Sequence, residues 1–137
     1  GLMRLHHVQV AMPPGAEDAA RLFYAGGLGM REVAKPELLR GRGGAWFRSY
    51  DGSGEVAAEI HLGVESPFRP ARKAHPALLL DSVSALDETA ERLTRLGFEV
   101  DRTERHTLPG HERVHAFDGH GNRVELLAVS RASERHH

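Results

Sequence analysis

The two halves of this 137-residue chain repeat each other at a nearly constant spacing. The copies share a histidine near the first strand, a leucine-glycine pair and a glycine-rich turn that follows an aromatic residue. In that order the landmarks are His7 and His75, 28–30 and 96–98, and 50–54 and 117–121. Because a unit of about 60 residues buries little core by itself, the repeat predicts one domain, 4–130, whose two units, 4–64 and 74–129, share a core.

Hydrophobic patterning gives both units the element order βαβββ. In the first unit it predicts strands at 4–12, 28–33, 45–50 and 56–63 and a helix at 16–24. In the second it predicts strands at 75–80, 98–101, 113–117 and 123–128, and a helix that Ser84 opens in a capping box with Asp87. We therefore expect an α+β fold of two pseudo-symmetric βαβββ units, whose sheets form an incomplete barrel or cup with the helices outside.

Composition excludes several classes of function. The formal charge is −1, from 18 basic and 19 acidic residues without a basic run, so there is no electrostatic footprint for nucleic acid or an anionic membrane. The absence of cysteine excludes disulfides and thiolate metal sites, and no apolar run reaches membrane-spanning length. We expect a cytoplasmic protein that meets a small-molecule substrate and a second copy of itself. Residues 1–3 and 131–137 are predicted to be tails, and His136 and His137 receive no role.

Strand alternation separates an apolar face from a face that carries metal-competent side chains. The helices should cover the apolar face, which receives Val8, Val10, Ile60, Leu62, Leu78, Leu80, Val124 and Leu126. The opposite face receives His7, His61, His75 and Glu125, on the first and last strands of the two units. A buried carboxylate needs a cation beside it. We predict that these four residues bind one divalent metal ion (Zn, Ni, Mn, Co or Fe) and leave two coordination positions open for catalysis.

Further residues on the same face are candidates for substrate contact. Before the two glycine turns, Trp46, Arg48 and Tyr50 share one face, as do Arg113, His115 and Phe117, and we interpret these sets as repeat equivalents. The predicted substrate-binding residues are Gln9, Trp46, Arg48, Arg113 and His115. Ordinary strand packing, with arginine stems over apolar surface, is the alternative. His6 falls on the helix-facing side, where we expect a partly buried structural histidine.

In its motifs the chain resembles the vicinal oxygen chelate superfamily of glyoxalases, bleomycin resistance proteins and dioxygenases. The resemblance covers 4–128 and is carried by His7-Val8, by Phe23-Tyr24 followed by 28–30, by the glycine-turn strand that ends in Glu125, and by the doubled βαβββ order. It implies metal ligands at His7, His61, His75 and Glu125. Glyoxalases usually carry a carboxylate at the fourth-strand position of His61, whereas His7, His75 and Glu125 match the thiol transferases of the family.

Three functions remain open from the sequence. The first is a glyoxalase-like metal-dependent lyase, isomerase or transferase that acts on a small substrate chelated through adjacent oxygens, with Glu125 or a metal-bound hydroxide moving the proton. The alternatives are a non-catalytic, bleomycin-resistance-like binding protein and an extradiol-type dioxygenase. Open sheet edges predict a homodimer, and the resemblance implies the same because members of the family frequently pair. The metal sites would lie within one chain or between two.

Overall fold

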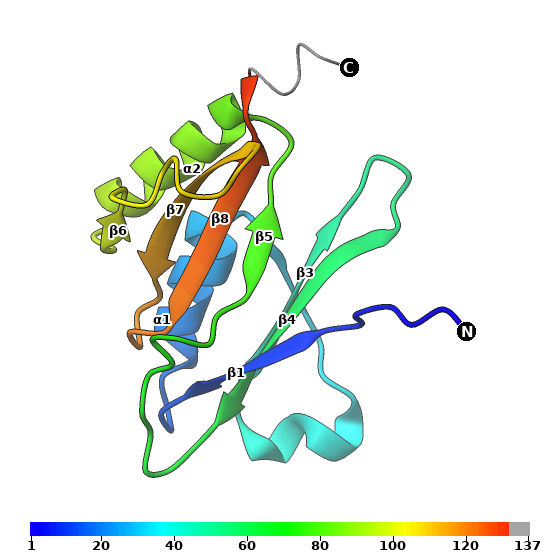
Figure 1. The fold of residues 1–137 in the computed structure, drawn as a ribbon. Coiled ribbons are helices and arrows are strands. Elements are labelled where there is room, and N and C mark those ends of the chain that lie inside the picture. The colour runs from blue at the N-terminus through cyan, green and yellow to red at the C-terminus, as the bar shows by residue number, and fades with distance from the viewer. Residues whose placement is uncertain (132–137) are drawn as a thin grey trace.

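Two four-stranded sheets and the helices that cover them make up the fold (Figure 1). The structure is a computed structural model that describes residues 1–131, so His136 and His137 of the predicted tail lie outside the described residues. In chain order the elements are β1 (Val8–Met12), α1 (Glu17–Ala20), the π-helix η1 (Arg21–Gly27), β2 (Arg31–Val33), the 3-10 helix η2 (Glu37–Arg42), β3 (Ala45–Tyr50), β4 (Val56–Val64), β5 (Ala77–Leu79), α2 (Val83–Arg95), β6 (Val100–Asp101), β7 (His111–Phe117) and β8 (Arg123–Val129).

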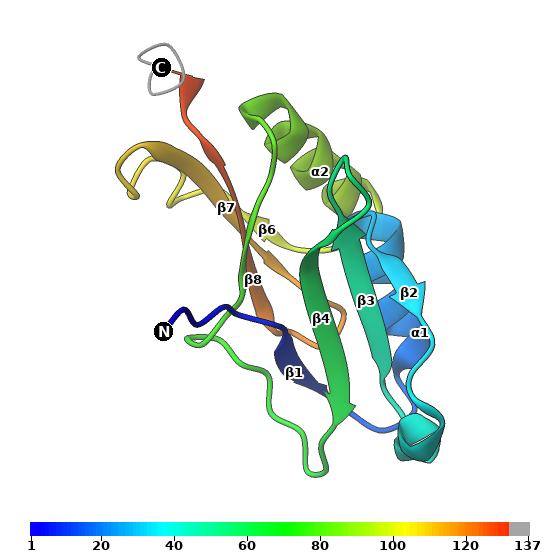
Figure 2. The ribbon, with the colours of Figure 1, turned by 90° about the vertical axis from the view of Figure 1, so that its right-hand side faces the viewer.

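Each unit forms its own sheet, in which the first and last strands are neighbours. The strand orders are β1-β4-β3-β2 and β5-β8-β7-β6, with β1 parallel to β4 and β5 parallel to β8. In the first unit η1 packs on β2 and β3, in the second α2 packs on β7 and β8, and the helices of the two units touch each other (Figure 2). The predicted fold of two βαβββ units in an open arrangement is confirmed. None of the described helices has the length and apolar run that a membrane crossing requires.

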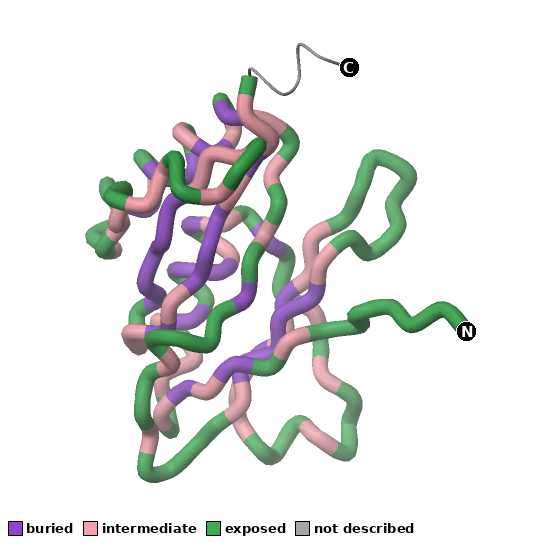
Figure 3. The backbone as a smooth tube through the Cα atoms, in the orientation of Figure 1, coloured by how far each residue is buried: buried purple, intermediate pink, exposed green. Residues whose placement is uncertain are grey.

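The core lies on the sheet faces that the alternation assigned to the helices. Five of the eight residues predicted there are buried, and the other three are partly buried against the same cluster. Figure 3 shows buried positions along β7 and β8, whereas the chain before β1 is exposed. The units meet at Gly27, where a Cβ would lie 2.3 Å from the Leu93 side chain. Glycine therefore lets the two helices approach, and Arg92 Nε donates to the Gly27 carbonyl at 2.9 Å.

The helical segments differ from the prediction in three places. The first helix widens after four residues into η1, where the Leu28 N–H donates to the Phe23 carbonyl five residues earlier, at 2.9 Å. The η2 helix was not predicted, since its sequence lacks an apolar period. The capping box predicted between Ser84 and Asp87 is wrong, because Ser82 caps α2 by accepting from the Ala85 N–H at 3.0 Å.

The prediction for His6 is also wrong. His6 is exposed and lies before β1, whose ladder begins at Val8. Strand alternation holds only where the ladder exists, so it could not assign a face to this residue. His6 Nδ1 instead lies 2.9 Å from Nδ1 of the neighbouring His7.

The turn between β7 and β8 joins distant segments through two buried polar side chains. Asp118 Oδ1 accepts from the Asn122 N–H at 2.9 Å, and Asp118 Oδ2 accepts from the Tyr24 hydroxyl at 2.7 Å. The Asn122 side chain donates to the Ala11 carbonyl at 2.7 Å and accepts from the Ala71 N–H at 2.9 Å. Asp118 is 4% exposed, Asn122 1% and Tyr24 0%. Because these buried groups are satisfied by one another, the turn holds both units together.

We expect Tyr24→Phe to lower the free energy of unfolding by about 1.5–3 kcal/mol, because it removes a buried hydrogen bond to a carboxylate. Urea unfolding followed by circular dichroism measures the change. Tyr50→Phe is the matched control, since Tyr50 is 37% exposed, and should change stability by less than about 0.5 kcal/mol. Equal effects of the two substitutions would contradict this role of Asp118.

Candidate functional site

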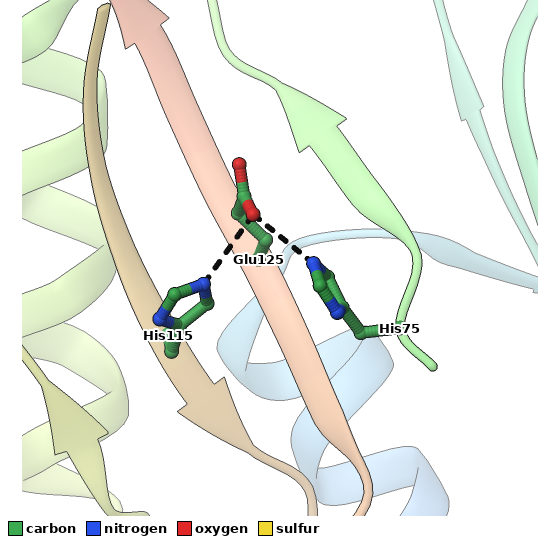
Figure 4. A group of neighbouring side chains, drawn as sticks. All are labelled: His75, His115 and Glu125. Atoms are coloured by element: carbon green, nitrogen blue, oxygen red, sulfur yellow. Dashed lines mark hydrogen bonds and ion pairs between the residues drawn. The ribbon is translucent and has the colours of Figure 1, made fainter. Parts of the chain in front are cut away.

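Two histidines and a glutamate meet on the face of the second sheet that points away from α2. His75 Nε2 lies 3.1 Å from Glu125 Oε1, and His115 Nε2 lies 3.3 Å from the same oxygen (Figure 4). One donor atom from each residue lies within 4.8 Å of the other two. In the part of the chain that the structure describes, this is the one such group of three metal-competent residues.

Strand register brings these three side chains together. Glu125 stands on β8 directly opposite His115 on β7, and it pairs in parallel with Ala77 on β5. His75 precedes β5 by two residues, and the Glu125 N–H donates to the Pro76 carbonyl at 2.9 Å, which fixes the approach of that segment. The cluster therefore depends on the central position of β8 between β5 and β7.

The His75 ring is oriented in a way that favours a cation beside Glu125. His75 Nδ1 lies 2.8 Å from the Lys73 carbonyl oxygen, which can only accept a hydrogen bond, so Nδ1 carries the hydrogen. In the neutral ring Nε2 then offers a lone pair toward Glu125 Oε1. Two facing lone pairs require a proton or a metal ion between them, and a backbone carbonyl that orients a histidine in this way is typical of metal ligands.

Glu125 is buried and is held in its charged form. Its side chain is 6% exposed, and Arg113 Nη1 donates to Oε1 at 3.3 Å. Burial by itself would raise the pKa of Glu125, but hydrogen bonding with His75 and His115 and the charge of Arg113 outweigh it and hold this pKa below its ordinary value. Within residues 1–131, Oε2 has no hydrogen-bond partner, so one carboxylate oxygen is free to bind a ligand.

The first sheet carries a second polar cluster on its corresponding face. Glu59 Oε2 lies 2.6 Å from His61 Nε2, and Arg48 Nε donates to Glu59 Oε1 at 2.8 Å. The His61 ring stacks between Trp46, at 3.8 Å between ring centroids, and His7, at 4.1 Å. The stack places His7 at its exposed end.

Electrostatics keeps this second cluster as an anion beside a neutral imidazole. Burial lowers the pKa of His61, although the hydrogen bond to Glu59 opposes the shift. Burial would raise the pKa of Glu59, but the bonds from His61 and Arg48 bring it below its ordinary value. With Nε2 donating to Glu59, the neutral His61 ring keeps Nδ1 as the nitrogen that can bind a ligand.

The structure brings the predicted ligands together in pairs. His7 and His61 meet on the first sheet, and His75 and Glu125 meet on the second. Within residues 1–131 of one chain, the two pairs share no hydrogen bond, ring contact or three-ligand group. The four residues therefore do not converge on one point of a single chain.

The predicted substrate-contact residues divide in the same way. Gln9, Trp46 and Arg48 belong to the first sheet, and Arg113 and His115 belong to the second. The strand register shows that the assumed pairing of Arg48 with His115 as repeat equivalents is wrong. Trp46 lies opposite His61, and His115 lies opposite Glu125. His115 is therefore the repeat equivalent of Trp46. The β3–β4 hairpin is longer and carries a bulge between Ser49 and Tyr50, which displaced the sequence alignment.

Sequence reasoning missed Glu59. This residue is 5% exposed and supplies a carboxylate on β4 two residues before His61. Its i−2 spacing from His61 on a strand, which places both on one face, was the signal that could have found it.

A cleft of about 690 Å³ lies between the two units and is lined by apolar residues together with His7, Glu59 and His75. Its walls come from β1 and β4 on one side and from the 75–80 segment on the other, with Met30 and Leu126 among the residues beneath. Leu5 and Leu79 line it and are 83% and 65% exposed. Among the described residues, β1 and β5 are edge strands and each lacks a neighbour on one side.

Comparison with known proteins gives a consistent picture. The family model described as Glyoxalase/Bleomycin resistance protein/Dioxygenase superfamily matches residues 4–126. No curated protein matches the chain. A glyoxalase family protein from Bacillus anthracis is 39% identical, with 95% of this chain and 98% of that chain covered and a TM-score of 0.80.

More distant solved structures share the fold. The fosfomycin resistance protein FosX from Listeria monocytogenes is 16% identical, with 97% of this chain and 98% of that chain covered and a TM-score of 0.66. A glyoxylase/bleomycin resistance protein/dioxygenase domain from Frankia sp. EAN1pec is 19% identical over 100% of both chains, with a TM-score of 0.69.

In metal-free protein we expect Glu125 to contribute stability that depends on pH. Its pKa is below the ordinary 4.5 in the folded chain, so the carboxylate stabilises the fold above that value, and the contribution is lost as pH falls through the lower, folded value. The difference in urea midpoint between the wild type and Glu125→Gln should be largest near neutral pH and shrink in acid. Glu65→Gln, at an exposed position, is the control and should follow the wild type. A difference that stays constant with pH would contradict this assignment.

Proposed function

Because the chain belongs to the glyoxalase/bleomycin resistance protein/dioxygenase superfamily, we propose that it is a glyoxalase-like metal-dependent enzyme. Its reaction is a lyase, isomerase or transferase reaction on a small substrate that binds through two adjacent oxygens. The observation that carries this proposal is the group His75, His115 and Glu125, with donor atoms within 4.8 Å of one another. Two imidazoles and a carboxylate suit Zn, Ni, Mn, Co or Fe.

Residues of the second sheet would hold the ion and handle the proton. His75 Nε2 and Glu125 are the ligands, and His115 offers a third donor from the same chain. When bound, a divalent ion polarises a substrate carbonyl and stabilises negative charge on its oxygens. Glu125 Oε2 takes the substrate proton and returns it, while Arg113 stays bonded to Oε1 and fixes the carboxylate. Glu125 is 4% exposed, so little of this residue faces solvent.

We further propose that the functional form is a homodimer with sites shared between chains. His7 and His61 contact each other and are not part of the group of His75, His115 and Glu125, so in this proposal a second copy supplies the His7 and His61 pair. The exposed Leu5 and Leu79 beside the open edges of β1 and β5 give a second copy an apolar surface to cover. In this arrangement His7 and His61 of one chain meet His75 and Glu125 of the other.

Metal content tests the enzyme proposal. Protein purified without chelator, with 132–137 removed, should contain about one divalent ion per chain by elemental analysis. His75→Ala should lose most of it, because the ring and Glu125 bind the same ion. The control His111→Ala, at a histidine outside the group, should keep the metal. Less than a tenth of one equivalent, with no gain on addition of Zn, Ni, Mn or Fe, would refute the proposal.

Subunit mixing tests the shared site. His7→Ala and Glu125→Ala proteins should each be inactive, but a mixed dimer regains one intact site, so mixing after partial unfolding and refolding should restore up to about a quarter of the wild-type activity. This fraction follows from half of the dimers being mixed, with one of two sites intact in each. Activity is sought among 2-oxoaldehyde hemithioacetals, epoxides and catechols. Absence of recovery, or a monomer mass by light scattering, would contradict sharing.

One observation favours a second candidate, a binding protein of the bleomycin-resistance type. Glu125 Oε1 already contacts His75, Arg113 and His115, so the carboxylate is compensated without a metal ion when one of the histidines is protonated. Such a protein would sequester a small molecule in the same place and turn nothing over. The metal analysis described above separates it from the enzyme.

A further inference from the structure

A small cationic pocket lies beside the His61 cluster at the end of the first sheet. It has a volume of about 200 Å³ and is lined by Lys35 and Arg42 of the segment around η2 and by Gln9, Trp46 and Gly63 of the sheet. Figures 1 and 2 place η2 next to the end of β4 where Val64 stands. Both Gln9 and Trp46 are the cross-strand partners of His61. The pocket therefore shares two of its walls with the surroundings of a proposed metal ligand.

Glycines shape this pocket where side chains would fill it. A Cβ on Gly63 would lie 2.7 Å from the Gln9 amide, so the absence of one lets Gln9 lie across β4. Gly43 and Gly44 have φ of +75° and +84°, and a Cβ on Gly44 would lie 2.0 Å from the Leu62 carbonyl. The 43–44 backbone can therefore press against β4 and carry Arg42 to the pocket.

Positive side chains outnumber negative ones around this pocket. The segment 35–42 holds Lys35, Arg40 and Arg42 against one acidic residue, Glu37. Lys35 Nζ donates to the Gly43 carbonyl, which holds the ammonium at the pocket without neutralising it. Arg42 makes no hydrogen bond or ion pair with any residue in 1–131, although it lines the pocket. Lysine and a free guanidinium in one small recess are suited to an oxyanion.

We propose that Lys35 and Arg42 form an anion-binding subsite that takes the carboxylate, phosphate or phosphonate group of the substrate. Gln9 contributes an amide donor and Trp46 a flat apolar wall. The substrate is then a compound that carries an oxyanion in addition to the adjacent oxygens that meet the metal. The role of this subsite in substrate choice rests on the proposed function, whereas the affinity of the subsite for an anion does not.

Fluorescence tests the subsite directly, because Trp46 is the one tryptophan of the chain and lines the pocket. Metal-free protein, freed of chelator, is titrated with inorganic phosphate and separately with acetate, at an ionic strength kept constant with chloride. We expect a saturable change in Trp46 emission. Arg42→Gln should raise the dissociation constant about tenfold or more, because it removes a charge-assisted contact.

Arg40→Gln is the matched control. Arg40 lies on the same helix but bonds to the Lys35 carbonyl and does not line the pocket, so its substitution should change the dissociation constant by less than about twofold. Tighter binding of phosphate or of acetate identifies which oxyanion the subsite prefers. A change that never saturates, or equal weakening by the two substitutions, would overturn the proposal. Since no metal or turnover is involved, this result is independent of the metal analysis.

Discussion

The buried Asp118 carboxylate organises the molecule, because its turn joins the two units by hydrogen bonds in addition to apolar contact. It holds Tyr24 of the first unit and Asn122 of its own turn, and Asn122 reaches Ala11 at the end of β1. Since each of these polar groups is buried, the geometry has few alternatives that leave all of them satisfied. The turn thereby sets where β8 begins, and with it the position of Glu125.

Much of the fold could be predicted because two signals agreed. The repeat gave the number of units, and the period-two pattern in strands such as Val124-Leu126 gave the buried face. The predictions of the α2 cap and of the 37–42 segment failed because these features depend on contacts that no local sequence pattern encodes. Ser82 and not Ser84 caps α2, two residues before the position that the capping-box pattern indicated. The η2 helix has no apolar period, and its position follows from how Gly43 and Gly44 pack on β4.

The sequence predicted most residues of the candidate site, but it did not predict which of them contact one another. Alternation placed His75, His115 and Glu125 on one face, but it could not show that His115 stands opposite Glu125. Glu59 was missed because its i−2 spacing from His61 is a weak signal by itself, and its contacts with Arg48 and His61 are visible only in the structure. Whether two pairs of ligands converge depends on how two sheets are placed, which strand patterns do not determine.

The adjacency of first and last strands has a consequence for the order in which the protein is made. In each unit the opening strand is held by the closing one, β1 by β4 and β5 by β8, so neither sheet is complete until its whole unit has left the ribosome. The first unit has the further bond from Asn122 to Ala11, across 111 residues. Such distant pairing slows folding. His75 precedes Glu125 by 50 residues, so the group of His75, His115 and Glu125 can form only after β8 has been synthesised.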